Sequence, residues 1–275
     1  FTAMFALAGT SANAIPSAPS LKPRLAFDSQ LISEADFSLL SEGLDAADKG
    51  QWSTVRRLKK RIADDDARNL LSLRIATSAS ANPSFSELSD ALASLDDWPK
   101  MNTTQKLAEK ALAASGLTHA QKRNWLNLNK PQTGEGKLEL ARILRNTGNA
   151  SQANDLIKEV WRSHSLSSRS TNAILSDHSR LLSKSDHAER VEMLLWTGQR
   201  SEARRLLSKL NTADRKLAEA RLALIEGRRG VDRTIKSVPT SMQNDPGLLH
   251  DRARWRRRKT RNMEGAIELL LKLDT

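Results

Sequence analysis

Apolar residues recur along most of the chain at the three- and four-residue spacing of an amphipathic helix. The clearest runs come in two pairs, 138–144 with 153–161 and 193–196 with 203–210. Gly148 separates the first pair and Gly198 the second, and each glycine precedes an alanine by five residues. Glycine can end a helix in the left-handed conformation, and alanine lets the next helix pack closely against it. The pattern therefore predicts antiparallel helical hairpins.

Looser copies of the same pattern begin at Gly50 and at Trp255, with an irregular period of about 30 to 50 residues. No proline interrupts residues 132–238. Helical pairs that contact mainly their neighbours stack into a superhelix. We therefore predict an all-α fold, an α-superhelix (solenoid) of degenerate TPR-like helical hairpins over residues 31–275, with a soft break near residues 129–136.

The composition agrees with this fold class and narrows the chemistry. Hydrophobic residues make up 39% of the 275 residues, enough to bury a core. Tyrosine is absent and valine is scarce, which disfavours β-sheets. The chain has no cysteine, which excludes disulfides, thiolate metal sites and a cysteine nucleophile. The net charge of +12 permits an acidic polymer as a partner without identifying one.

The two ends of the sequence carry separate predictions. Residues 1–14 read FTAMFALAGTSANA, an apolar stretch with an A-x-A ending, and predict a signal-peptide remnant that is cleaved after Ala14. An apolar N-terminal segment without a targeting role is the alternative. Residues 15–30 contain three prolines and predict an extended tether. No run of 18 apolar residues follows, so no transmembrane segment is expected, and we expect the natural chain to continue beyond Thr275.

The residue types needed for catalysis or metal binding do not form a recognisable motif. The five histidines include no H-E-x-x-H pair, and the Gly-Glu-Gly at 134–136 lacks the lysine of a phosphate-binding loop. Ser-Asp-His occurs at 176–178 and 185–187, where an aspartate at a helix start is a simpler explanation than a paired histidine site. The acidic residues of 64–66 and 96–97 are typical of caps and turns. We therefore predict no catalytic residue, no metal ligand and no cofactor in this chain.

The strongest charge feature is a basic run that contains one tryptophan. Seven of the ten residues from 252 to 261 are lysine or arginine. The candidate contact residues, for a glycan or for another domain, are Arg252, Arg254, Trp255, Arg256, Arg257 and Arg258. Such a run could bind phosphates while the tryptophan stacks on a base, but export removes the usual nucleic-acid partner, so none is expected. Charges on all sides of one helix favour packing against neighbouring helices or contact with another domain.

The tryptophans at 52, 161 and 196 fall at apolar positions of the predicted hairpins. This placement predicts that they fill the core between stacked helices. Stacking on a sugar ring is the functional alternative, and it is disfavoured because the sequence shows no polar cluster beside these residues.

Five sequence blocks between residues 44 and 273 carry a resemblance to one protein family. They are GQWSTVRRLKKRIADDDARNLL, SFSELSDALASLDDWP, GEGKLELARILRNTGNASQANDLIKEVWR, DHAERVEMLLWTGQRSEARRLL and DPGLLHDRARWRRRK. The last two blocks, 186–207 and 245–259, are the most specific. The first of them holds a D-H-x-x-R…L-L-W run (Asp186, His187, Arg190, Leu194, Leu195 and Trp196), and the second holds an R-A-R-W-R-R-R-K helix (252–259). With these blocks the chain resembles the superhelical U-shaped domain of the soluble lytic murein transglycosylases of Gram-negative bacteria. It departs from that family at Leu95-Asp96, where Asn-Pro usually precedes Asp-Trp-Pro.

The resemblance implies a periplasmic location and a scaffold through which glycan strands of peptidoglycan pass. In the family, a separate C-terminal lysozyme-like domain cleaves the bond between N-acetylmuramic acid and N-acetylglucosamine and forms a 1,6-anhydro product. No position here matches the catalytic glutamate motif of that domain, so no catalytic residue is carried over. The expected partners are therefore glycan strands and the catalytic domain. A non-catalytic helical-repeat adaptor that binds a protein partner is the alternative.

Overall fold

The computed structural model describes residues 32–95 and 97–273, and within these ranges every regular element is helical. The α-helices are α1 (Glu34–Asp48), α2 (Trp52–Lys59), α3 (Asp65–Thr77), α4 (Phe85–Ser94), α5 (Met101–Leu112), α6 (His119–Asn129), α7 (Gly134–Asn146), α8 (Ala150–Ser163), α9 (Ser168–Asp177), α10 (Lys184–Trp196), α11 (Arg200–Leu206), α12 (Thr212–Glu226), α13 (Val231–Ser237), α14 (Pro246–Trp255) and α15 (Met263–Leu271). A π-helical turn, η5 (Arg256–Thr260), follows α14. The all-α prediction is confirmed. The predicted signal-peptide remnant (1–14) and tether (15–30) lie outside the described residues.

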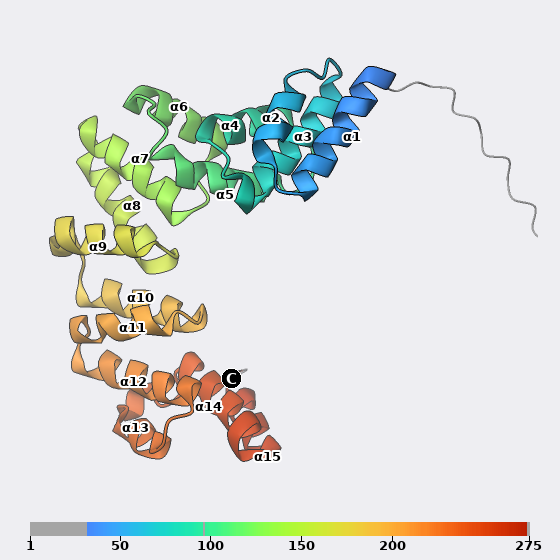
Figure 1. Ribbon diagram of the computed structural model, residues 1–275. Coiled ribbons are helices and arrows are strands. Elements are labelled where there is room, and N and C mark those ends of the chain that lie inside the picture. The colour runs from blue at the N-terminus through green and yellow to red at the C-terminus, as the bar shows by residue number, and fades with distance from the viewer. Residues whose placement is uncertain (1–31, 96, 274–275) are drawn as a thin grey trace, which may run out of the picture.

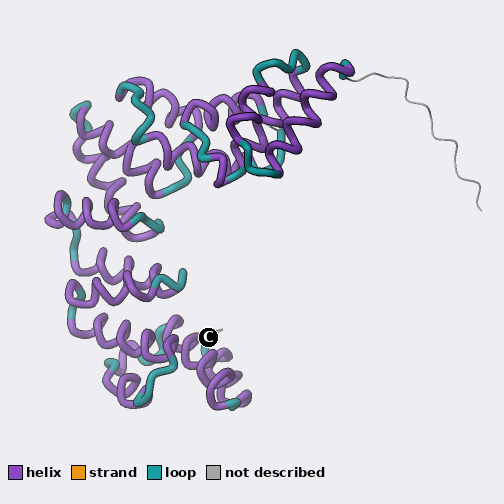
Figure 2. The backbone as a smooth tube through the Cα atoms, in the orientation of Figure 1, coloured by secondary structure: helices purple, strands orange, loops and turns teal. Residues whose placement is uncertain are grey.

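The helices follow one another in a curved file instead of gathering around one centre (Figure 1). Helices α1 to α8 form one arm, and α9 to α15 form a second arm that leaves the first at a steep angle (Figures 1 and 2). The larger contacts between α-helices join a helix to its next or second-next neighbour, as in α7 with α8 and α10 with α12. The hydrophobic core is therefore divided into several clusters along the file.

The turns predicted at glycine are present. Gly148 and Gly198 follow the ends of α7 and α10 with left-handed φ angles of +85° and +76°, and Gly50 follows α1 in the same way at +70°. Ala153 and Ala203 lie in the first turns of the next helices and are completely buried. Glycine thus ends one helix and alanine allows the close approach of the next, as the sequence pattern predicts.

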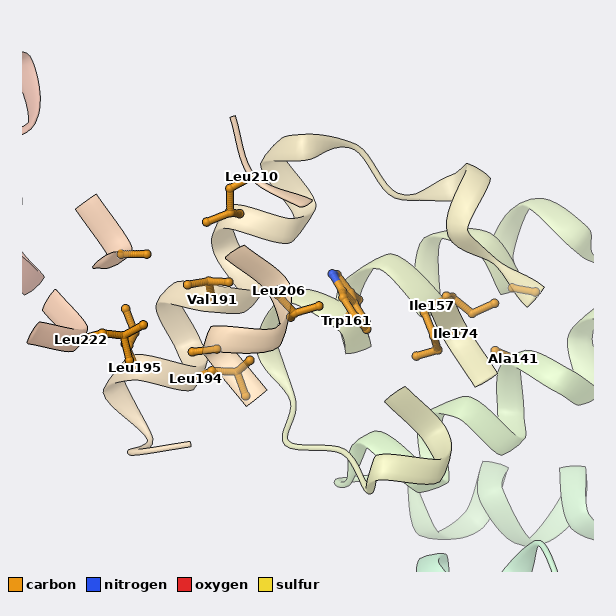
Figure 3. Packing of buried hydrophobic residues seen from close by; sticks show 13 residues of the cluster. Ala141, Ile157, Trp161, Ile174, Val191, Leu194, Leu195, Leu206, Leu210 and Leu222 are labelled. Carbon is orange, nitrogen blue, oxygen red and sulfur yellow. The ribbon is translucent and has the colours of Figure 1, made fainter. Parts of the chain in front are cut away.

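The largest apolar cluster joins α7 to α12 across the start of the second arm. Trp161 is completely buried in this cluster, with Ile157 on its own helix and Leu194 and Leu206 on α10 and α11 (Figure 3). The prediction that Trp161 fills the core is confirmed. Trp52 is half-buried and packs against the separate cluster of α1 to α3.

The same prediction is wrong for Trp196, whose residue surface is 51% exposed. At 3.6 residues per turn, the nine residues from His187 to Trp196 turn the helix by about 180° beyond whole turns. His187, Arg190 and Leu194 are all buried on one face of α10. Trp196 is the last residue of the helix and lies on the other face, so the apolar pattern placed it in the core incorrectly.

The predicted soft break near 129–136 coincides with the loop between α6 and α7. A buried carboxylate on α5, Glu109, accepts hydrogen bonds from the backbone N–H groups of Gln132 at 2.8 Å and Thr133 at 2.7 Å. Lys122 on α6 and Glu139 on α7 form an almost completely buried ion pair at 3.0 Å. The loop is therefore attached to α5, and the two helices that flank it are joined to each other.

Candidate functional site

The basic run lies on α14 and on the turn that follows it. Asp245 caps α14, because its carboxylate accepts the N–H of the third helical residue at 2.8 Å. Beyond Trp255 the helix widens into η5, where the Thr260 hydroxyl donates to the Arg256 carbonyl at 2.9 Å. Arg261 then takes the left-handed conformation, with φ at +54°, before α15 begins. In the looser copy of the pattern that begins at Trp255, the left-handed residue of the turn is therefore an arginine instead of a glycine.

Three of the six candidate residues of this run serve packing. Trp255 is half-buried against the apolar cluster of α12 to α14. Arg256 donates from Nη1 to the Gly265 carbonyl at 2.7 Å, which ties η5 to α15. Arg252 is half-buried, and its pKa is lowered by burial and then by the nearby charge of Arg256. These side chains are committed to contacts within the helical file.

The other three candidates, Arg254, Arg257 and Arg258, are exposed. Together with His250 they line a groove of about 460 Å³ between α14, η5 and α15. Apolar side chains complete the lining: Ala253, Met263, Ala266, Ile267 and Leu270. The result is a basic-rimmed apolar groove at the C-terminal end of the file.

A second polar site joins α10, α12 and α14 around a buried cation. Arg221 is only 1% exposed, and its Nε donates to Asp251 at 2.8 Å while its Nη1 donates to Glu192. Burial by itself would lower the pKa of Arg221, but the two carboxylates outweigh it and raise this pKa. A Cβ atom at Gly247 would overlap the guanidinium, so the close approach of α14 requires glycine there.

The exposed Trp196 belongs to this site. Its Nε1 donates to Glu192 at 2.5 Å, and its ring centroid lies 5.0 Å from that of His250 and 5.2 Å from the Arg221 guanidinium carbon. His250 in turn contacts Asp251 through Nδ1 at 3.3 Å. We call these five residues, Glu192, Trp196, Arg221, His250 and Asp251, the Trp196 cluster.

Sequence reasoning missed the Trp196 cluster. Its members come from three helices, α10, α12 and α14, and are spread along the chain from Glu192 to Asp251. No local sequence motif therefore connects them. The expectation that no polar cluster accompanies the tryptophans is wrong at Trp196. The sequence pointed to this site only indirectly: four of the five residues fall inside the two most specific blocks of the family resemblance, 186–207 and 245–259.

The other residues of the D-H-x-x-R run are structural. Ser183 is the N-cap of α10, and Asp186 completes a capping box by accepting the Ser183 backbone N–H at 2.8 Å. The helix-start interpretation is thus confirmed for the second Ser-Asp-His triplet, whereas the Asp177 of the first triplet is the last residue of α9. His187 meets Trp161 edge to face at a centroid distance of 5.5 Å. Arg190 lies 5.0 Å from the Trp161 ring centroid and donates to the Trp161 carbonyl at 3.2 Å, and burial lowers its pKa to about 10. This run therefore fixes α10 to α8.

The remaining candidates for chemistry are ordinary helix ends. Asp64 caps α3 through the Ala67 N–H at 2.8 Å, as predicted, and Asp96 lies outside the described residues. Over 32–95 and 97–273, no group of three or more His, Asp or Glu side chains could hold a metal ion. In this part of the chain no helix combines the length and the apolar character needed to cross a membrane.

Comparisons with family models, with curated proteins and with solved structures found no match for the chain. The function therefore has to be inferred from the residues of the groove and the Trp196 cluster, and from the sequence blocks themselves.

Proposed function

We propose that this chain is the helical scaffold of a periplasmic lytic transglycosylase, an α-superhelix of degenerate TPR-like hairpins. In this proposal it guides glycan strands of peptidoglycan to a C-terminal catalytic domain. That domain cleaves the bond between N-acetylmuramic acid and N-acetylglucosamine with formation of a 1,6-anhydro product. The chain itself contributes binding and positioning, and no catalytic residue.

One observation carries this proposal beyond the sequence blocks. The two most specific blocks, far apart in the sequence, meet in space: Glu192 and Trp196 from the first contact the same buried Arg221 as Asp251 from the second. Their contact on one ion network supports the view that the two blocks belong to one structural unit. The curved file of helices also supports a scaffold, since its contacts are local and its inner side spans both arms (Figure 1).

The test is co-sedimentation of the purified chain with insoluble peptidoglycan sacculi. We expect the chain to pellet with sacculi at physiological salt and to release no anhydromuropeptides into the supernatant. Carboxylated beads of equal charge density are the control, because a chain with a net charge of +12 adsorbs to any acidic surface at low salt. Equal pelleting with sacculi and beads would overturn the proposal, as would release of anhydro products by this chain alone.

A second candidate function, a helical-repeat adaptor, is favoured by the basic-rimmed apolar groove. An apolar floor beside three exposed arginines suits an amphipathic helix whose apolar stripe is flanked by carboxylates. A synthetic amphipathic peptide with glutamate flanks should then bind more tightly than its lysine-flanked twin. The difference should disappear when Arg254, Arg257 and Arg258 are all changed to glutamine, and its persistence in that variant would exclude the groove as the docking site.

A further inference from the structure

We infer that the Trp196 cluster is a carbohydrate-binding site, in which the indole ring stacks on a pyranose ring and the neighbouring polar groups hydrogen-bond its hydroxyl or amide substituents. The inference deepens the proposed function and rests on it only in naming peptidoglycan as the source of the sugar. The chemistry of the cluster leads to the same ligand class independently.

The first step is that Trp196 is exposed and at the same time held in place. Half of its surface is open to solvent. Burial of apolar surface is favourable, so an isolated tryptophan side chain usually packs against the protein. Here its N–H is bound by Glu192, its ring contacts His250, and the buried Arg221 lies 5.2 Å from the ring centroid. The ring is thus a pre-organised aromatic surface, and a ligand loses little by ordering it.

The second step concerns the polar groups beside the ring. The side chains of Glu192 and His250 are 41% and 39% exposed, so both reach solvent next to the indole. The Glu192 carboxylate oxygens have lone pairs beyond those used by Trp196 and Arg221. Within the described residues His250 uses only Nδ1, toward Asp251, which leaves Nε2 for a ligand. Because the Asp251 carboxylate can only accept, His250 Nδ1 carries the proton and Nε2 of the neutral ring is an acceptor. A flat apolar face with hydrogen-bond acceptors at its edge matches a sugar, which has C–H faces and hydroxyl donors at its edges.

The third step separates sugar from the other ligands that stack on tryptophan. The residues that follow Trp196, namely Thr197, Gly198 and Arg200, are exposed and carry no apolar side chain. His250 is the one member of the Trp196 cluster that also lines the apolar groove, so the ring lies at the margin of that apolar surface. The charged group that hydrogen-bonds the indole directly is a carboxylate, Glu192, and a phosphate placed beside the ring would lie close to it. A neutral, hydroxyl-rich ligand is the class that remains.

The experiment is isothermal titration of the full chain with a β-1,4-linked N-acetylglucosamine tetramer. We expect saturable binding that is weakened about tenfold in Trp196→Ala, the scale of a lost aromatic contact, and partly retained in Trp196→Phe. Phe37→Ala is the matched control, since Phe37 is an exposed aromatic residue on α1, in the other arm, and should leave affinity unchanged. Circular dichroism establishes that each variant keeps its helical content.

Each result has a defined meaning. Equal affinity in wild type and Trp196→Ala, or no binding of the tetramer, overturns the sugar site; wild-type pelleting with sacculi would then still support the scaffold. Trp196-dependent binding of the tetramer without pelleting on sacculi supports the sugar site and overturns the proposed peptidoglycan scaffold. Tight binding of single-stranded oligonucleotides that is lost in Trp196→Ala would overturn the assignment to carbohydrate.

Discussion

Arg221 carries its charge inside the helical file, where the residue is only 1% exposed. Arginine is seldom buried without a partner, because removing its charge from water is costly. On α12 it follows Ala218 and Ala220 in a helix that otherwise looks simply amphipathic. Its partners Glu192 and Asp251 become visible only after α10, α12 and α14 pack together. The three charges are therefore paired only in the packed fold.

Replacement of Arg221 should destabilise the fold strongly. Arg221→Met keeps most of the side-chain volume but leaves Asp251, only 5% exposed, without its cation. We expect a loss of about 3–5 kcal/mol in the free energy of unfolding, measured by urea denaturation. Arg254→Met, at an exposed position, is the control and should change stability by less than about 0.5 kcal/mol. Equal losses in the two variants would contradict the role given to the buried network.

A buried histidine should make stability depend on pH near neutrality. The pKa of His187 is lowered from its ordinary value of 6.5, first by burial and then by the charge of Lys209. The folded state thus binds protons less readily than the unfolded state, so the stability is complete above pH 6.5 and is lost as the pH falls from there toward the folded pKa. His187→Phe, which retains an edge contact with Trp161, should flatten the decline in urea stability between pH 7.5 and 5.5.

The exposed His119 provides the comparison for this pH effect. His119→Phe should keep the slope of the wild type. The slope in His187→Phe should be smaller but not zero, because burial also lowers the pKa values of His164 and His178. An unchanged slope in His187→Phe would show that His187 does not contribute to the acid sensitivity of the fold.

At the scale of single elements, the sequence predicted the regular helices and their glycine turns and missed the irregular ones. Gly148 and Gly198 were readable because left-handed turns need glycine and leave a local signature. The turn after α14 was not readable, since a π-helical turn and a left-handed arginine have no comparable residue preference. The error at Trp196 has a different cause: the apolar run ends on the last residue of α10, whose direction lies about half a turn away from the buried face.

The turn at Gly198 offers a test of that backbone requirement. A Cβ atom at this position would meet no heavy atom within 4 Å, so a substitution changes only the backbone strain at φ +76°. Gly198→Ala should therefore lower the free energy of unfolding by about 1–2 kcal/mol. Gly198→Asn should lower it by less, because asparagine tolerates the left-handed conformation better. A Gly198→Ala variant as stable as the wild type would mean that the turn relaxes to another conformation.

At the scale of the whole molecule, the bend between the arms lies beyond what apolar spacing can specify. Periodicity predicts which face of a helix is buried, but the curvature of a file is the sum of small rotations between successive helices, each set by side-chain packing. The separation of the core into clusters has the same origin, since the larger contacts of each described helix are with its near neighbours. The Trp196 cluster also depends on the packing between helices, because its residues meet only when α10, α12 and α14 are in the correct register.

The open, bent shape gives the last prediction, which small-angle X-ray scattering can test. A compact protein of the same length as a variant that begins at Ile32 would have a radius of gyration of about 18 Å. The two arms leave each other at a steep angle, and over residues 32–95 and 97–273 the larger contacts between α-helices reach no further than the second-next helix (Figure 1). We therefore expect a radius clearly above that value and a pair-distance distribution with a long tail, unchanged by protein concentration. A radius near 18 Å would mean that the arms close onto each other in solution. The open inner side on which the proposed scaffold function depends would then be absent.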